Sequence, residues 1–239
     1  MRSSSSLRSL CIAAALIVAS TMSSRAENGG EGQGCPRADL IVTTTPAPAQ
    51  AAARVQDHLA LKAALPPAAD VVMIGDSLVR GWELQWAGAA FAEARISNLG
   101  IGGDKVQNVL WRLRDLPLSS LRPRRVVLLA GTNNLPSDNQ ACAIAAGIAE
   151  IVRTIATAWP DARLDVIGIP PRGDAFSSRN TTRLEVNRLI RDVAQRAGAR
   201  YVDADAALIK AGPPAYRQDK LHFTELAYRI FGDLLNDPH

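Results

Sequence analysis

The sequence of 239 residues predicts an α/β fold, a three-layer αβα sandwich in which helices cover both faces of a five-stranded parallel sheet. Three observations lead to this prediction. Five short runs are rich in β-branched residues and are bounded by Gly, Pro or Asp. The segments between them repeat apolar residues at helical spacing. Strand and helix alternate along the chain, and this order requires right-handed crossovers between parallel strands.

The runs that we expect to be strands cover residues 71–74, 95–99, 125–130, 164–169 and 201–203. The helix expected after the second strand has apolar residues at Val106, Val109, Leu110 and Leu113. The helix expected after the third strand has them at Ile144, Ile148, Ile151, Val152 and Ile155. Thr182 and Glu185 have the spacing of a capping box, which would open a helix that turns Val186, Leu189, Ile190 and Val193 inward. The last expected helix, over residues 223–235, aligns Leu226, Ile230 and Leu234.

The first 26 residues have the pattern of a secretory signal peptide. Arg2 and Arg8 precede an apolar stretch over residues 10–19, and small residues flank the expected cleavage after Ala26. This stretch is about ten residues long, whereas a membrane-spanning helix needs about 20. We therefore expect a mature chain without a membrane-spanning segment, exported to the periplasm or out of the cell.

Cleavage after residue 26 would change the charge of the chain. The segment holds three arginines and no acidic residue, so its removal leaves 24 basic residues against 23 acidic ones. A net charge of about +1 gives no support for a nucleic-acid or anionic-membrane partner. It is compatible with self-association, and a homodimer is left open.

Residues 27–50 are rich in Gly, Pro, Thr and Ala, and we expect them to form a flexible leader before a folded domain over residues 51–239. The mature chain would keep Cys35 and Cys142, which form either a disulfide or two independent thiols. Neither cysteine has a metal-ligand neighbour, and His58 and His239 lie in unrelated contexts. We predict no metal site.

Two short motifs supply the parts of a serine hydrolase. Residues 75–78 (Gly-Asp-Ser-Leu) follow the first expected strand, and residues 219–222 (Asp-Lys-Leu-His) lie near the C-terminus. Ser77 would be the nucleophile, His222 the base, and Asp219 the carboxylate that orients the imidazole. If the second motif is one turn of helix, Asp219 and His222 share a face. Taken alone, Ser77 is a common turn residue and His222 a common surface histidine.

Donors for an oxyanion follow three neighbouring strands. They are the backbone N–H groups of Ser77 and Gly103 and the side-chain amide of Asn133. Active sites of parallel sheets form beyond the carboxyl ends of the strands, which is where all three residues fall. Each has a simpler interpretation, because glycines after a strand often serve a tight turn and Asn133 could be a turn residue. We expect Leu78, Thr132 and Leu221 to line the space beside the nucleophile, although as isolated residues they would be ordinary packing residues.

These motifs together resemble the four signature blocks of the SGNH, or GDSL, hydrolases. Residues 98–113, 131–134, 170–173 and 219–228 are similar to the catalytic subunits of type Ib platelet-activating-factor acetylhydrolases. The similarity runs from about residue 70 to 235, whereas the leader and residues 212–217 do not obviously match.

The resemblance implies a flavodoxin-like three-layer fold, a triad of Ser77, Asp219 and His222, and no cofactor. It also implies an oxyanion hole formed by Ser77, Gly103 and Asn133. A further implication is a tight pocket for an acetyl group, lined by Leu78, Thr132 and Leu221.

We therefore expect an exported serine esterase that removes acetyl or other short acyl groups from a small-molecule or glycan ester through an acyl-enzyme. A carbohydrate O-acetyl esterase is the second hypothesis, since export would bring the enzyme to envelope or environmental polysaccharides. A lysophospholipase or long-chain lipase is the third. A non-catalytic binding protein is disfavoured, because every catalytic residue type is present at a matching position.

Overall fold

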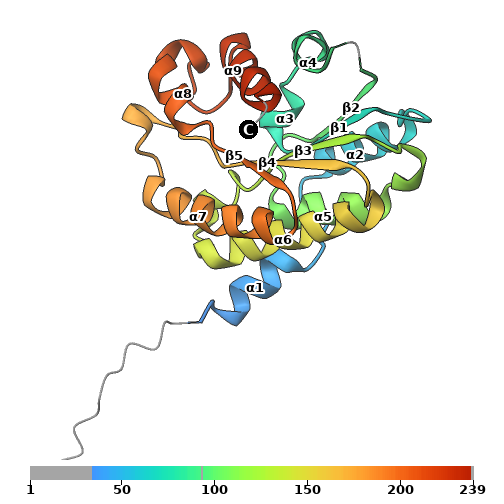
Figure 1. Ribbon diagram of the computed structural model, residues 1–239. Helices are drawn as coiled ribbons and strands as arrows, with labels where there is room; N and C mark the ends of the chain where they lie inside the picture. The colour runs from blue at the N-terminus through green and yellow to red at the C-terminus, as the bar shows by residue number, and fades with distance from the viewer. Residues whose placement is uncertain (1–33, 93, 238–239) are drawn as a thin grey trace, which may run out of the picture. The chain divides into compact units, whose positions relative to one another are not determined.

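The computed structural model describes residues 34–92 and 94–237, so the predicted signal peptide lies outside the described residues. Five parallel strands lie in the order β2-β1-β3-β4-β5, which confirms the predicted sheet (Figure 1). The strands are β1 Val71–Gly75, β2 Ile96–Gly100, β3 Arg125–Leu129, β4 Arg163–Ile167 and β5 Arg200–Val202.

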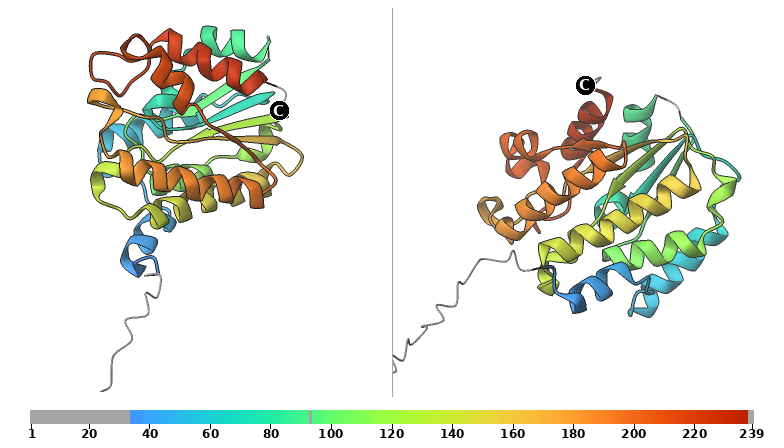
Figure 2. Two further views of the ribbon diagram at one scale, coloured as in Figure 1. Left: turned by 60° about the vertical axis from the view of Figure 1, so that its left-hand side comes forward. Right: turned by 60° about the horizontal axis from the view of Figure 1, so that its bottom comes forward.

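Helices cover both faces of the sheet, as predicted (Figures 1 and 2). One face carries α3 Ser77–Arg80, α4 Leu84–Phe91, α8 Asp205–Ala211 and α9 Glu225–Asn236. The other face carries α2 Ala52–Ala63, α5 Val106–Asp115, α6 Ala141–Ala158 and α7 Asn180–Arg196. Short 3-10 helices lie in the connections: η1 Leu118–Ser120, η2 Leu135–Ser137, η3 Asp174–Phe176 and η4 Pro213–Ala215.

Alternate residues of the strands enter two apolar cores. Val72 and Ile74 of β1 pack with α5, α6 and α7, whereas Val71 and Met73 pack with α4, α8 and α9. This is the two-residue period of a strand buried on both faces. Among the described residues, α6 is the one helix long and apolar enough to cross a membrane by length and composition. Core packing accounts for that composition, because its isoleucines are buried against the sheet.

The register brings the ends of three strands to one level. Gly75 at the end of β1 lies beside Gly100 of β2 and Leu129 of β3. Because the strands are parallel, the segments that follow them leave the sheet at the same edge. The three segments predicted to supply the site therefore lie together.

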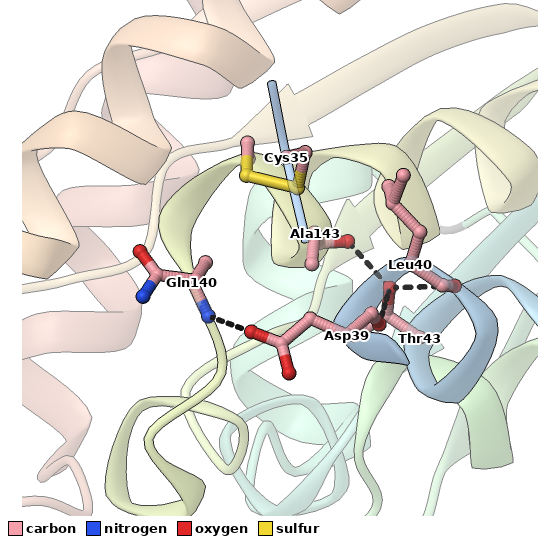
Figure 3. The surroundings of a disulfide bond; sticks show 7 residues. Cys35, Asp39, Leu40, Thr43, Gln140 and Ala143 are labelled. Carbon is pink, nitrogen blue, oxygen red and sulfur yellow. Dashed lines mark hydrogen bonds between the residues drawn. A yellow bond between two sulfur atoms is a disulfide. The ribbon is translucent and has the colours of Figure 1, made fainter. Parts of the chain in front are cut away.

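The prediction of a flexible leader over residues 27–50 is wrong from Cys35 onward, and residues 27–33 lie outside the described chain. Helix α1 Arg37–Thr44 packs against α5 and α6. A disulfide joins Cys35 to Cys142, with 5.8 Å between the two Cα atoms (Figure 3). The two cysteines, whose pairing the sequence left open, are therefore bonded to each other.

Polar contacts also hold α1 in place (Figure 3). The buried Thr43 hydroxyl donates to the Ala143 carbonyl at 2.7 Å, and the Asp39 carboxylate accepts from the Gln140 N–H at 3.1 Å. Gly147 allows the close approach, because a Cβ there would lie 2.7 Å from the Thr43 carbonyl oxygen. The leader prediction counted large apolar residues, and it therefore missed a segment held by a disulfide and hydrogen bonds.

Two helices differ in detail from the expected pattern. Helix α7 begins at Asn180, so Thr182 lies inside the helix and does not cap it. Helix α9 buries Ala227, Tyr228, Phe231 and Leu235, whereas Leu226 is 42% exposed. Aromatic contacts determine which residues of α9 face the core, because Tyr228 stacks on Trp82 with 5.5 Å between ring centroids.

Charged groups are buried beneath the carboxyl edge of the sheet. Arg112 is 2% exposed, and its Nε donates to Asp104 Oδ2 at 2.6 Å. Asp76 is fully buried and caps α3 by accepting a hydrogen bond from the Leu78 N–H, while its Oδ2 has no partner. Burial raises the pKa of Asp76 to about 7, and the Asp104 charge acts in the same direction. Asp76 therefore holds its proton well above the ordinary range of a carboxyl group.

We expect Asp76→Asn to remove part of the pH dependence of stability. In the unfolded chain an aspartate ionises near pH ~4, whereas folded Asp76 keeps its proton up to about pH 7. The folded state binds more protons in that window, so the wild-type free energy of unfolding decreases as the pH rises through it. Asparagine keeps an acceptor for the Leu78 N–H but cannot ionise. Urea unfolding at a series of pH values measures the effect, and identical slopes in both proteins would contradict it.

Candidate active site

Ser77 lies directly after β1, at the first position of α3. Gly75 permits this placement, because a Cβ there would lie 2.0 Å from the Leu129 carbonyl oxygen of β3. The Asp76 side chain caps the helix by accepting from the Leu78 N–H at 2.9 Å. The Ser77 N–H is one of the unpaired donors of the first turn, where the backbone favours a negative charge.

The structure brings the three residues predicted to form a triad into one hydrogen-bonded chain. His222 Nε2 lies 3.0 Å from Ser77 Oγ, and His222 Nδ1 lies 2.7 Å from Asp219 Oδ2. Ser77 and His222 are 145 residues apart in the sequence. The imidazole therefore has the carboxylate at one nitrogen and the hydroxyl at the other.

Residues 219–222 form a turn, not the turn of helix that would place Asp219 and His222 on one face. Lys220 has φ 56°, and Asp219 Oδ1 accepts from the N–H groups of Leu221 and His222 at 3.0 and 2.9 Å. Desolvation raises the pKa of Asp219, but the hydrogen bonds from the His222 ring and these N–H groups outweigh it and lower that pKa to about 2. One carboxylate thus shapes the backbone of the turn and also holds the ring.

Backbone contacts hold this turn from two sides. The Arg217 N–H donates to the His222 carbonyl at 2.7 Å, and the Gly173 N–H donates to the Lys220 carbonyl at 2.8 Å. Tyr216 donates its hydroxyl to the Pro171 carbonyl at 2.8 Å. Residues 170–173, which the sequence singled out without a role, therefore support the turn that carries His222.

Gly103 and Asn133 lie in the loops after β2 and β3, the two strands that flank β1. A Cβ on Gly102 would lie 3.9 Å from Ser77 Cβ, so the glycine loop runs beside the serine. Gly103 has φ 77°, which favours glycine. Asn133 Nδ2 donates to the Asp104 carbonyl at 2.9 Å, which leaves its second amide hydrogen for another acceptor.

The three predicted pocket residues differ in burial. Leu78 and Thr132 are 1% and 2% exposed, whereas Leu221 is half-buried. Leu78 belongs to the core shared with α9, and its carbonyl accepts from the Tyr228 hydroxyl at 2.9 Å. The Thr132 hydroxyl accepts a hydrogen bond from Arg172 Nη1 at 3.3 Å. All three are adjacent in sequence to a triad or oxyanion residue.

Sequence reasoning missed two arginines beside these residues. Arg172 is 8% exposed, and its Nε has no hydrogen-bond partner. Arg54 donates from Nη1 to the Gly103 carbonyl at 2.6 Å. Arg172 lies in the Pro-Pro-Arg-Gly run, which was a usable signal, whereas nothing in the sequence distinguishes Arg54 from other arginines on amphipathic helices. Within the described part of the chain, no three His, Cys, Asp or Glu side chains gather as a metal site would require.

Comparison with known proteins agrees with this geometry. The model of the GDSL-like lipase/acylhydrolase family matches residues 73–230. The human platelet-activating factor acetylhydrolase IB subunit alpha2 is 32% identical over 161 residues, which cover 66% of this chain and 69% of that protein. The rat alpha1 subunit is 36% identical over 166 residues, which cover 66% and 70%.

A solved structure shares the fold. An acetyl-xylooligosaccharide esterase from Geobacillus Stearmophilus, solved as a W190I mutant, superposes with a TM-score of 0.58 at 16% identity and covers 69% of this chain and 91% of that one. The family match spans more than half of the sequence, and it includes the serine turn, the Asp-His turn and all of the sheet except the first two residues of β1. The chain therefore belongs to the GDSL-like lipase/acylhydrolase family, the SGNH hydrolases, and is an ester hydrolase.

Proposed function

We propose that the protein is an exported serine esterase that hydrolyses acetyl or other short acyl esters through an acyl-enzyme on Ser77. The observation that carries the proposal is the position of the His222 ring, 3.0 Å from Ser77 Oγ and 2.7 Å from Asp219 Oδ2. An imidazole held in this way is suited to accept the serine proton at neutral pH.

In the first half of the reaction, Ser77 Oγ attacks the ester carbonyl carbon while His222 Nε2 takes its proton. The imidazolium then gives that proton to the leaving alcohol, and the acyl group stays on Ser77. In the second half, a water molecule gives a proton to His222 and attacks the acyl carbon. The bond from that carbon to Ser77 Oγ then breaks, the imidazolium returns the proton to Oγ, and the acid leaves. Asp219 remains ionised throughout, because its pKa is about 2.

The carbonyl oxygen gains negative charge in both halves. The Ser77 and Gly103 N–H groups and the second amide hydrogen of Asn133 are the donors that we assign to it. Since Asn133 is already fixed on the Asp104 carbonyl at 2.9 Å, its amide needs little reorganisation when the charge develops.

The preference for a short acyl group rests on the pocket residues and on the relatives. We assign the buried Leu78 and Thr132 to the wall of the acyl site, where they would leave little room for a long chain. The curated relatives are named as acetylhydrolase subunits, and acetyl is the shortest acyl group after formyl.

Ser77→Ala should abolish hydrolysis of p-nitrophenyl acetate, with a loss of at least about 10⁴-fold in kcat, because the attacking atom is removed.

Asn133→Ala should lower kcat by roughly 10² to 10³-fold, because one oxyanion donor is lost. Ser120→Ala, at an exposed serine of η1 (Leu118–Ser120), is the matched control and should behave as wild type. Robust turnover by Ser77→Ala, or failure of wild type to react with a fluorophosphonate, would overturn the proposal.

A carbohydrate O-acetyl esterase is the second candidate, and the exposure of the site favours it. The side chains of His222 and Asp219 are 35% and 50% exposed, so a bulky alcohol part can approach the triad from solvent.

Activity on p-nitrophenyl esters should be highest at two carbons and should decline along the series, because the buried pocket residues limit acyl length. Parallel assays of acetate release from an acetylated xylan and from an acetylated phospholipid identify the alcohol part. Faster release from xylan supports the glycan esterase, and faster release from the phospholipid supports a lipid esterase. A maximum at eight carbons or more would refute the short-acyl assignment.

Export is supported by the apolar stretch of the first 26 residues and by the Cys35–Cys142 disulfide, since disulfides persist in oxidising compartments. When the full chain is expressed in a bacterial host, the exported fraction should contain protein that begins at Glu27. Its intact mass should also show one disulfide and the loss of residues 1–26. An uncleaved chain retained in the cytoplasm, with Cys35 and Cys142 both free to react with an alkylating reagent, would refute export.

A further inference from the structure

Helix α2 contacts the two loops that the proposed reaction uses. Arg54 Nη1 donates to the Gly103 carbonyl at 2.6 Å, in the loop after β2. One turn further along α2, Asp57 accepts from Arg80 Nη1 at 2.8 Å, and Arg80 ends the helix that begins at Ser77. Helix α2 therefore bridges the glycine loop and the nucleophile helix, although it contributes none of the residues assigned to the reaction.

The glycine loop needs such a support. Gly102 and Gly103 are adjacent, and glycine has the largest backbone freedom of any residue, so the direction of their N–H groups is costly to fix. Other contacts hold the loop at Asp104: its N–H donates to the Ile101 carbonyl at 3.3 Å, and its carbonyl accepts from Asn133 at 2.9 Å. Among the described residues, Arg54 is the only one that hydrogen bonds to Gly103 itself.

The fit between Arg54 and Gly103 is close. A Cβ on Gly103 would lie 3.3 Å from Arg54 Nη1 and 3.6 Å from Arg54 Cδ, so the arginine covers the side of the glycine where a side chain would stand. A hydrogen bond from a guanidinium to a carbonyl is charge-assisted and stronger than one between neutral groups. The Gly103 carbonyl lies in the peptide unit after the Gly103 Cα, and the Gly103 N–H lies in the unit before it. Arg54 therefore holds the following unit through its hydrogen bond and restricts the preceding one by packing against the glycine.

We propose that Arg54 is a positioning residue for the oxyanion hole: by holding the Gly103 carbonyl and packing against the same glycine, it restricts the directions that the Gly103 N–H can take before a substrate arrives. This inference rests on the proposed function, in which that N–H stabilises the oxyanion. Donors of this kind act on charge that is present in the transition state and not in the bound ester. Loss of Arg54 therefore lowers kcat and leaves KM nearly unchanged.

A role confined to stability predicts a different result. If Arg54 only ties α2 to the domain, its removal lowers the melting temperature and leaves the kcat of the folded enzyme unchanged. Lys62 offers the matched control, because it lies on the same helix, makes an ion pair with Asp115 at 2.9 Å and, among the described residues, makes no hydrogen bond to the glycine loop.

The test compares Arg54→Met, Arg54→Lys and Lys62→Met in the full mature chain with its disulfide. Removing one oxyanion donor lowers kcat by roughly 10² to 10³-fold, and a misdirected donor should lower it by less. We therefore expect kcat to fall about 10-fold or more in Arg54→Met, with KM within about twofold of the wild-type value. Lysine keeps a charged donor and should restore part of kcat. Lys62→Met should keep the wild-type kcat.

A second readout separates positioning from folding. A trifluoromethyl ketone, which forms a tetrahedral oxyanion on the serine, should bind Arg54→Met more weakly by the same factor as the loss in kcat. Melting curves show that each variant is folded at the assay temperature, and if Arg54→Met is not folded the comparison is made with Arg54→Lys and Arg54→Gln.

One outcome would overturn this inference alone. In that outcome, folded Arg54 variants keep the wild-type kcat and ketone affinity, while Ser77→Ala is inactive and Asn133→Ala is impaired. A loss of kcat equal in Arg54→Met and Lys62→Met would also overturn it. Turnover by Ser77→Ala or wild-type kcat in Asn133→Ala would instead count against the proposed function. The two failures are thus distinguishable.

Discussion

The site depends on one buried cation, Arg112. Its Nε donates to Asp104, its Nη1 to the Leu99 carbonyl of β2, and its Nη2 to the Gly75 carbonyl of β1. A buried charge destabilises a protein unless it is paired and fully hydrogen bonded, and here one carboxylate and two strand-end carbonyls meet that requirement. The same contacts fix the glycine loop to the ends of the two strands that precede Ser77 and Gly103. Asp104 then accepts from Asn133 through its carbonyl, so the loop after β3 is held to the loop after β2.

The two other members of the proposed triad, Asp219 and His222, are placed by a turn and not by a helix or strand. The Arg217 N–H donates to the His222 carbonyl, the Gly173 N–H donates to the Lys220 carbonyl, and the Asp219 carboxylate accepts from two backbone N–H groups of the same turn. Such a turn is open to solvent, as the exposure of Asp219 shows, yet its backbone is constrained on both sides. An exposed site with a constrained backbone suits an enzyme whose substrate carries a large alcohol part.

The sequence predicted what local patterns determine. Strand runs and helical spacing are properties of neighbouring residues, and the motifs around Ser77, Gly103 and Asn133 follow strands, so their meeting at one edge could be inferred from the parallel order. Features that depend on distant partners were missed. The docking of α1 depends on Cys142, 107 residues from Cys35, and on Ala143, 100 residues from Thr43, and composition carries no record of such pairing. On α9, Tyr228 is buried and stacks on Trp82, whereas Leu226 of the predicted aliphatic stripe is exposed and Ile230 and Leu234 are only partly buried.

Because the sequence predicts local patterns and not distant contacts, the residues that hold the site in place are harder to predict than the residues assigned to the reaction. The proposed reaction requires a hydroxyl, a carboxylate and an imidazole at positions 77, 219 and 222, and these residue types mark the positions in the sequence. A support needs only a donor at the right place, and any long polar side chain on a suitable helix can provide it. The N-terminal segment is an example. The disulfide docks α1, and Ala47 then exchanges hydrogen bonds with Gln107 and Asn108 of α5. The chain next enters α2 at Ala52, and this helix brings Arg54 to Gly103. A segment that composition predicts to be flexible is thus joined, contact by contact, to the loop beside Ser77. The positions of oxyanion donors have to be held to fractions of an ångström for those donors to act.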